Sequence, residues 1–207
     1  EPMITLTGVT KTFRSGRGRV DALVDVSMEI STGCFAAVMG KSGSGKSTLL
    51  NCVGWLEVPD RGEIRCFETA VNQLAARPLS QFQRRHLGFV FQRGNLLSYL
   101  TVAENIFLDR QFHNLAGVVN WGRVYAEAQK LLDQLGVKGI TPFDKVSGLT
   151  VGMQQMVEIA KALSKVAEIL VFDEPTSALT EAEVDALFTT IRQLKKNGVC
   201  MSYISHK

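Results

Sequence analysis

The stretch Gly40-Lys41-Ser42-Gly43-Ser44-Gly45-Lys46-Ser47-Thr48 decides how this chain of 207 residues is interpreted. It matches the phosphate-binding pattern G-x-x-x-x-G-K-[ST]. Glycines in this pattern let successive backbone N–H groups turn inward around an anion, and the helix that follows points its positive N-terminal end at the same place. We therefore predict that the whole stretch binds the phosphates of a nucleotide.

Two side chains of this loop have a further predicted role. Lys46 adds a mobile positive charge near the β- and γ-phosphates, and the hydroxyl of Ser47 is a small, hard oxygen ligand that suits Mg²⁺. The surroundings also fit the motif. The apolar segment Cys34–Met39 predicts a buried strand before the loop, and Lys46–Val53 predicts a helix after it.

A second motif lies at the end of the apolar segment Ile169–Phe172, which predicts another buried strand. Asp173 and Glu174 follow it, at the carboxyl end of a strand, where open α/β sheets bind ligands. Asp173 is a candidate ligand of Mg²⁺, and Glu174 is a candidate to polarise a water for attack on the γ-phosphate. Together with the phosphate-binding loop, this pair predicts a nucleotidase.

Strand-like and helix-like segments alternate along the chain, which predicts an α/β domain around a mainly parallel sheet. Further strands are predicted at Leu87–Phe91 and Val199–Ile204. Apolar positions at helical spacing predict helices over Trp121–Leu135 and Met156–Leu163, and Thr180 with Glu183 forms a capping box for a last helix. No strand is expected between about Asn95 and Lys165, so this region is predicted to be a helical insertion.

Composition and charge exclude several classes of protein. Hydrophobic residues make up 45% and charged residues 21% of the chain, which argues against disorder. A net charge of +3 is too balanced for a nucleic-acid-binding surface, so no nucleic-acid partner is expected. No apolar run approaches the roughly 20 residues of a membrane span, and no secretory signal is expected at the start. The four cysteines have no metal-binding spacing and are expected to be reduced thiols.

The order of the motifs resembles that of the ATP-binding cassette (ABC) ATPases, from Phe13 to His206. The residues that carry the resemblance are the phosphate-binding loop, Gln92, Leu149–Gln155, Asp173–Thr180 and Ser205-His206. The resemblance implies a P-loop NTPase fold with a mainly parallel core sheet, an N-terminal antiparallel β part and an inserted α-helical subdomain. It also implies three stretches: a first core part over 1–94, the helical subdomain over 95–165, and a second core part over 166–207.

The resemblance assigns roles to individual residues. Phe13 corresponds to the aromatic residue that stacks on adenine, although a partly buried core aromatic remains an alternative. Gln92 corresponds to the glutamine that touches Mg²⁺ and the attacking water and faces the transmembrane partner. Glu174 corresponds to the catalytic base, and His206 to the histidine that contacts the γ-phosphate and Glu174. Residues Ser177–Thr180 match the loop that couples the two ATP sites of a dimer.

The signature segment departs from the usual L-S-G-G-Q of the family, because this chain has Leu149-Thr150-Val151-Gly152-Met153. Thr150 keeps a hydroxyl and Gly152 keeps a close backbone approach, so both are expected to bind the γ-phosphate of ATP held by the opposite subunit. Val151 and Met153 replace Gly and Gln, which leaves the strength of dimer closure open.

The two halves of the chain resemble different branches of the family. The second half is similar to the ATPases of bacterial monosaccharide importers of the ribose, xylose and galactose type, through Leu100–Leu108, Val157–Leu163 and Tyr203–Lys207. The first half is similar to ATPases of lipoprotein release and macrolide export, through Val20–Ser27 and Leu87–Gln92. A mosaic chain with a seam near Tyr99–Val102 is therefore a hypothesis.

The leading interpretation is an ATP-hydrolysing subunit that energises an ABC transporter for sugar import, with ATP and Mg²⁺ as cofactors. Its expected partners are a second ATPase domain, in a head-to-tail dimer, and transmembrane permease subunits, at the cytoplasmic face of the membrane. The alternatives are an export-type ATPase, a soluble ABC ATPase that acts on ribosomes or DNA, and a fragment without turnover. Because members of the family continue past the histidine that corresponds to His206, this chain is also expected to be a shortened and less stable cassette.

Overall fold

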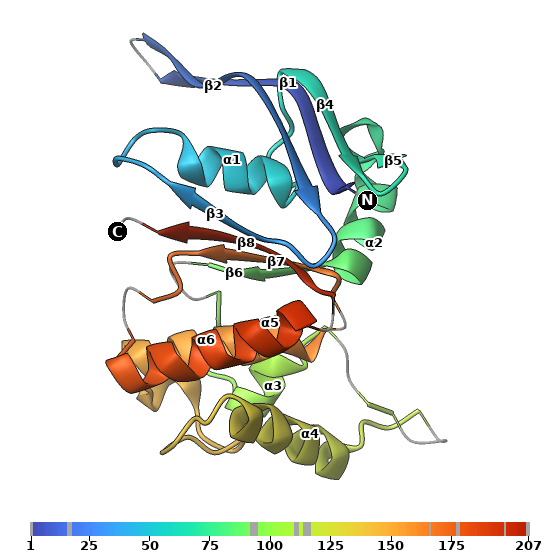
Figure 1. Cartoon of the computed structure of the whole chain (residues 1–207). Coiled ribbons are helices and arrows are strands. Elements are labelled where there is room, and N and C mark those ends of the chain that lie inside the picture. The colour runs from blue at the N-terminus through green and yellow to red at the C-terminus, as the bar shows by residue number, and fades with distance from the viewer. Residues whose placement is uncertain are drawn as a thin grey trace. The chain divides into compact units, whose positions relative to one another are not determined.

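The structure is a computed structural model that describes residues 2–15, 18–91, 95–109, 112–113, 117–165, 167–176, 179–196 and 198–205 (Figure 1). Its internal contacts divide the chain into two compact units. The first unit comprises Glu1–Phe89, Ala167–Glu174 and Lys195–Lys207, and the second comprises Val90–Val166 and Pro175–Leu194. The functional division into 1–94, 95–165 and 166–207 stays a prediction.

The first unit contains an antiparallel sheet, as the family resemblance implies. Its strands run in the order β2-β1-β4-β5, with the bounds Pro2–Ser15 (β1), Gly18–Ser31 (β2), Arg61–Cys66 (β4) and Thr69–Ala70 (β5). Apolar side chains such as Ile4, Leu6 and Ile64 are buried on one face of this sheet. The opposite face is polar, which is the usual pattern for a sheet that is covered on one side.

The same unit contains the predicted parallel sheet, with the order β3-β8-β7-β6. Its strands are Phe35–Met39 (β3), Leu87–Val90 (β6), Ile169–Asp173 (β7) and Cys200–Ser205 (β8). Phe35 pairs with Met201 and Asp173 pairs with Ile204 in parallel register. Because neighbouring strands run the same way, the carboxyl ends of β3, β7 and β8 meet at one edge of the sheet.

Helix α1 (Lys46–Val53) has the bounds that the sequence predicts, and Figure 1 shows it between the two sheets. Its residues Leu50, Cys52 and Val53 are buried, and the helix contacts β2, β7 and β8. A 3₁₀ turn (Val71–Gln73) and helix α2 (Ala76–His86) complete the first unit. Helix α1 therefore contributes to the core directly behind the phosphate-binding loop.

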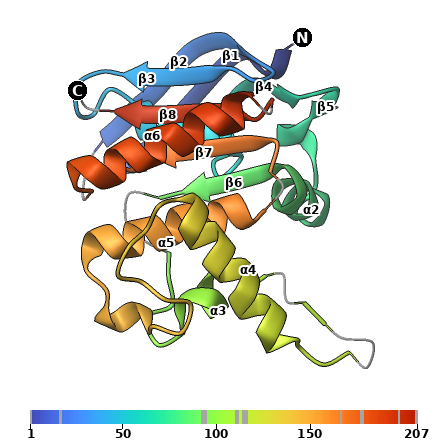
Figure 2. The same cartoon turned by 60° about the horizontal axis from the view of Figure 1, so that its bottom comes forward.

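The second unit is helical and includes most of the helix that follows Thr180. It contains α3 (Val102–Ile106), α4 (Trp121–Gln134), α5 (Val151–Ser164) and most of α6 (Glu181–Lys196), with a 3₁₀ turn at Val146–Gly148. Helices α3, α4 and α5 contact one another and lie side by side in Figure 2. Between residues 95 and 165, the described part of the chain has isolated β-bridges but no strand.

Hydrogen bonds at helix starts confirm one predicted cap and add another. The Thr180 backbone N–H donates to Glu183 Oε2 at 2.8 Å, and the Glu183 N–H donates to Thr180 Oγ1 at 3.4 Å, so the predicted capping box of α6 is present. Thr101 and Glu104 form a second capping box on α3. Among the described residues, no helix is long and apolar enough to cross a membrane.

All four cysteines are free thiols in the first unit, as expected. Burial raises the pKa of the Cys52 thiol to about 11. It also raises the pKa values of Cys66 and Cys200 to about 12. These three thiols are therefore protonated at neutral pH and act as small apolar core groups.

Candidate nucleotide-binding site

The phosphate-binding loop turns sharply into α1 through residues with positive φ. Gly43 has φ 78° and Gly45, the N-cap of α1, has φ 86°. The Ser44 N–H donates to the Lys41 carbonyl at 3.2 Å, and the Leu49 N–H donates to the Gly45 carbonyl at 2.8 Å. A Cβ atom on Gly45 would lie 2.3 Å from the Ala22 carbonyl oxygen, so only glycine fits there.

Lys46 folds back over this loop. Its side chain is buried, and its Nζ donates to the carbonyl oxygens of Gly40 at 2.8 Å and Lys41 at 2.9 Å. These two bonds hold the positive charge against the loop backbone at the N-terminal end of α1. The hydroxyl residues Ser47 and Thr48 follow in the first turn of the same helix, where backbone N–H groups lack partners within the helix.

The parallel sheet brings the second motif to the same edge as the loop. The loop follows β3, Asp173 is the last residue of β7, and Glu174 comes directly after it. Asp173 is half-buried, and its Oδ1 atom is shielded from solvent. Strand β8 ends at this edge with Ser205. The predicted residues Gln92, Ser177 and His206 lie outside the described residues.

The backbone of Glu174 adopts a left-handed conformation with φ 47°. For a residue other than glycine this conformation costs on the order of 1 kcal/mol, and such strain gathers at functional sites. The described residues contain three other non-glycine residues with positive φ: Asp25, Trp55 and Phe67. Among these four residues, Glu174 is the one that follows a strand of the parallel sheet, beside a predicted metal ligand.

Phe13 lies on β1, and its ring is 38% exposed. Lys11 Nζ lies 5.3 Å from the centre of that ring, close enough for a cation–π contact. Lys11 is itself held by Glu57 at 3.0 Å and by the Val58 carbonyl at 2.8 Å. Phe13 is thus partly exposed, so it is accessible for stacking, and both this role and that of a partly buried aromatic stay predictions.

The signature segment forms the N-terminus of α5 in the second unit. Thr150 is the N-cap, and its Oγ1 accepts the Met153 N–H at 3.3 Å. Val151 is 69% exposed and Gly152 is half-buried. Gln154 Nε2 donates to the Leu149 carbonyl at 3.0 Å, which holds the loop before the helix. The helix therefore presents the Thr150–Val151 corner and its positive dipole end to solvent.

A set of contacts that the sequence did not predict lies further along α5. Gln155 Nε2 donates to the Phe91 carbonyl and Lys161 Nζ donates to the Asn95 carbonyl, each at 3.2 Å. Glu158 lies between them on the same helix face, is 2% exposed, and bonds to the backbone of Asn95. The signal in the sequence is that these three polar residues recur every third position along a mostly apolar helix. These side chains hold both flanks of the segment that contains Gln92.

Burial raises the pKa of the Glu158 carboxyl above its ordinary value of 4.5. Because the folded-state pKa is the higher one, Glu158 stabilises the fold below about pH 4.5 and this contribution is lost as the pH rises through the raised pKa. We expect Glu158→Gln to raise the free energy of unfolding by about 1–2 kcal/mol near neutral pH and by less in acid. Urea unfolding of both chains from about pH 4.5 to about pH 8 measures this difference.

The matched control for this prediction is Glu68→Gln, because Glu68 is exposed. This change should have the same small effect on the free energy of unfolding at every pH. The prediction fails if the difference in the free energy of unfolding between the Glu158→Gln chain and the unchanged chain is the same at every pH.

Comparison with known proteins links this geometry to one family. The profile of the family described as "ABC transporter" matches residues 23–177. A protein of Agrobacterium fabrum that carries the name of a ribose/galactose/methyl galactoside import ATP-binding protein is 39% identical over the whole chain. The xylose import ATP-binding protein XylG of Thermoanaerobacter pseudethanolicus is 38% identical, also over the whole chain. The chain spans 39% and 40% of the length of these two proteins.

Solved structures show the same fold. The dimeric ATP-binding cassette MJ0796 bound to ADP and Pi matches 99% of this chain and 88% of its own length, with 32% identity and a TM-score of 0.89. A second dimeric structure of MJ0796, described as a bacterial ABC transporter cassette, matches the same shares with 33% identity and a TM-score of 0.90. The fold class predicted from the sequence is confirmed.

Proposed function

The chain belongs to the ABC transporter family, and from this premise we propose that it binds ATP with Mg²⁺ and hydrolyses ATP to drive sugar import. One observation carries the chemical part of the proposal. The phosphate-binding loop after β3 and the Asp173-Glu174 pair after β7 lie at the same edge of one parallel sheet. This arrangement supports the proposal, because the loop and the two carboxylates belong to one unit.

The phosphate-binding part of the site consists of backbone N–H groups and one cation. The loop N–H groups and the N-terminus of α1 bind the β- and γ-phosphates, and Lys46 leaves the Gly40 and Lys41 carbonyls for the phosphate oxygens. The ring of Phe13 stacks on the base. The loop is held in its turn by hydrogen bonds of its own, so it is organised before the nucleotide arrives.

The donor set fits Mg²⁺ rather than a softer metal. Ser47 and Asp173, together with Gln92, would hold the ion through hydroxyl, carboxylate and amide oxygens. Magnesium is usually bound by one or two protein ligands together with substrate phosphates, so a sparse set is sufficient. When bound, the ion neutralises charge on the phosphates.

Glu174 acts on the water that attacks the γ-phosphate. Its carboxylate follows a buried strand, so it is held by a rigid element, and it orients the water and accepts its proton. His206, next after β8, contacts the γ-phosphate and Glu174 in this proposal. Catalysis is then mainly positioning and stabilisation of charge.

A second copy completes the site in this proposal. Thr150 and Gly152 bind the γ-phosphate held by the partner in a head-to-tail dimer, with the dipole of α5 adding positive potential. The dimeric cassettes among the solved relatives support this arrangement. The names of the sequence relatives support sugar import over export and support permease partners at the cytoplasmic face of a membrane.

Lys46→Ala tests the proposal. Loss of its charge is expected to weaken ATP binding at least about tenfold, because charge-assisted bonds to phosphate are among the strongest polar contacts. Titration with a fluorescent ATP analogue measures the affinity, and the exposed Lys138, changed to Ala, is the control of equal charge. In vesicles with the full transporter, the same change should stop ATP-driven uptake of ribose, xylose or galactose. An ATP affinity that Lys46→Ala leaves unchanged would contradict the proposed nucleotide site. A transporter that, without this change, takes up none of these sugars would contradict sugar import.

A further inference from the structure

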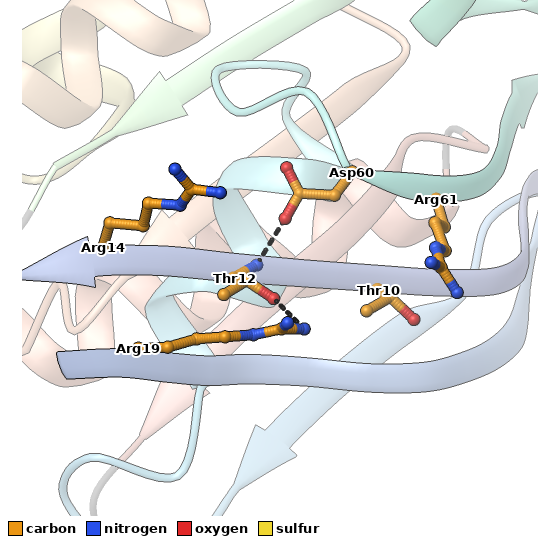
Figure 3. A pocket seen from close by; sticks show the side chains of 6 residues that line it. All are labelled: Thr10, Thr12, Arg14, Arg19, Asp60 and Arg61. Atoms are coloured by element: carbon orange, nitrogen blue, oxygen red, sulfur yellow. Dashed lines mark hydrogen bonds between the residues drawn. The ribbon is translucent and has the colours of Figure 1, made fainter.

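We propose that the polar face of the antiparallel sheet carries a second anion-binding pocket, separate from the nucleotide site, that takes a phosphate group of a small molecule or lipid. The cavity has a volume of about 520 Å³. Its lining residues are Thr10, Thr12, Arg14, Arg19, Asp60 and Arg61 (Figure 3). We call this cavity the arginine pocket.

Three adjacent strands supply the guanidinium groups. Arg14 on β1 pairs with Arg19 on β2, and Thr10 on β1 pairs with Arg61 on β4. Cross-strand partners lie side by side on one face of a sheet, so residues far apart in the sequence meet here. Figure 3 shows the two threonines on the strand between Arg19 and Arg61.

The arginine pocket lies on the face of β1 opposite to the nucleotide site. Successive side chains of a strand point to opposite faces. Thr10, Thr12 and Arg14 line the pocket, whereas Lys11 and Phe13 alternate with them and point to the other face. Lys11 is engaged there with Glu57. A ligand in the arginine pocket therefore does not compete for the phosphate-binding loop.

Two of the three guanidinium groups of the pocket have no counter-ion among the described residues, whereas Arg19 is paired with Asp21. Within the part of the chain that the structure describes, neither Arg14 nor Arg61 has an ion pair or hydrogen bond of its side chain. Arg19 is held in place, since its Nε donates to Asp21 Oδ1 at 2.8 Å and its Nη2 to Thr12 Oγ1 at 3.4 Å. The pocket's one carboxylate, that of Asp60, accepts the Thr12 backbone N–H at 2.7 Å.

Arg14 and Arg61 are left without a counter-ion from the residues that the structure describes, and Arg14 lies directly across the strand pair from Arg19, so like charges are close together here, which destabilises a sheet. A bound anion removes this repulsion. Arginine is also the side chain whose planar fork matches phosphate oxygens with two parallel hydrogen bonds. The Thr10 hydroxyl can add a neutral donor, whereas the Thr12 hydroxyl already donates to Asp21 Oδ1 at 2.8 Å. The cavity is larger than a phosphate group, so it has room for part of the molecule that carries it.

Titration with pyrophosphate tests the proposal in a chain that carries Lys46→Ala, which weakens the first phosphate site. Calorimetry is expected to show saturable binding that the double change Arg14→Gln and Arg61→Gln weakens at least about tenfold. The double change Arg77→Gln and Arg85→Gln on α2 removes the same charge from exposed positions elsewhere and should alter the affinity less than about threefold. Circular dichroism checks that each chain is folded.

A second arm distinguishes the source of the phosphate. Vesicles of phosphatidylcholine with phosphatidylglycerol are sedimented with the same chains at physiological ionic strength. Binding of pyrophosphate that depends on Arg14 and Arg61 supports a soluble phosphate ligand, and vesicle binding with that dependence supports a lipid headgroup. Binding that both double changes weaken equally, or no binding in either arm, would overturn the proposal.

Discussion

Replacing Glu174 by Gln is expected to lower the rate of ATP hydrolysis about a thousandfold, while the affinity for ATP changes less than about threefold. Glutamine has the same size as glutamate and keeps the hydrogen-bonding reach of the side chain. It cannot accept the proton of the attacking water, however. The left-handed backbone at this position has the same cost for both residues, so the change isolates the chemistry of the carboxylate.

Phosphate release at saturating ATP measures the rate, and a fluorescent ATP analogue measures the affinity. Glu29→Gln, an exposed change on β2, is the control of equal charge and should leave both quantities unchanged. A turnover within about tenfold of the unchanged chain would assign the base elsewhere. Loss of affinity together with turnover would indicate a damaged loop rather than a missing base.

Gly45→Ala is expected to have the largest effect on stability and nucleotide binding. The new Cβ would lie 2.3 Å from the Ala22 carbonyl oxygen, and φ 86° is unfavourable for any residue with a side chain. The contact is with backbone, so relief requires β2 and the loop to move apart. We expect a loss of about 3 kcal/mol or more in the free energy of unfolding and no measurable ATP binding.

The same loop offers the control for this change. Gly43 has a similar φ of 78°, but an added Cβ there would meet nothing within 4 Å. Gly43→Ala is therefore expected to cost only the backbone strain, about 1 kcal/mol. Urea unfolding and ATP titration of both variants separate strain from collision. Equal losses of stability and ATP affinity in the two variants would show that the contact with the Ala22 carbonyl is not what requires glycine at residue 45.

Elements whose bounds depend on neighbouring residues in the chain could be predicted from the sequence. The helix over Lys46–Val53 was predicted with the bounds that it has, because the loop glycines end the strand and leave the N-terminus of the helix defined. The capping box of α6 was predicted for the same reason, since its two side chains are three residues apart. The placement of Asp173 at the end of β7 follows from a short apolar run alone.

The bounds of the antiparallel strands could not be predicted from the sequence. β1 and β2 have a polar face and several register shifts, so strict alternation of apolar and polar residues is interrupted. Strand β4 begins at Arg61, which already pairs with Thr10 of β1. The pairing of Arg14 with Arg19 and of Thr10 with Arg61 likewise depends on register, which no local pattern specifies.

Site residues that depend on tertiary contact were missed for a related reason. Glu158 is charged and sits in a helix that looks like an ordinary amphipathic segment, so its burial beside Asn95 cannot be deduced from its neighbours in sequence. Helix α5 also begins at Val151, earlier than the predicted stretch, because Thr150 provides the N-cap. Both features connect the signature segment to the flanks of Gln92 through one helix.

The position of β8 in the parallel sheet also determines when this protein can fold during its synthesis. Strand β3 has β8 as its partner in the sheet, and β8 lies between β3 and β7 although it follows both in the chain. While the ribosome is still making α6, none of the strands that the structure describes lies beside β3, and one edge of β7 is open. Unpaired edges are templates for aggregation, and pairing between distant segments is slow. The nascent chain therefore exposes these strand edges until residues 200–205 emerge and pair with β3 and β7.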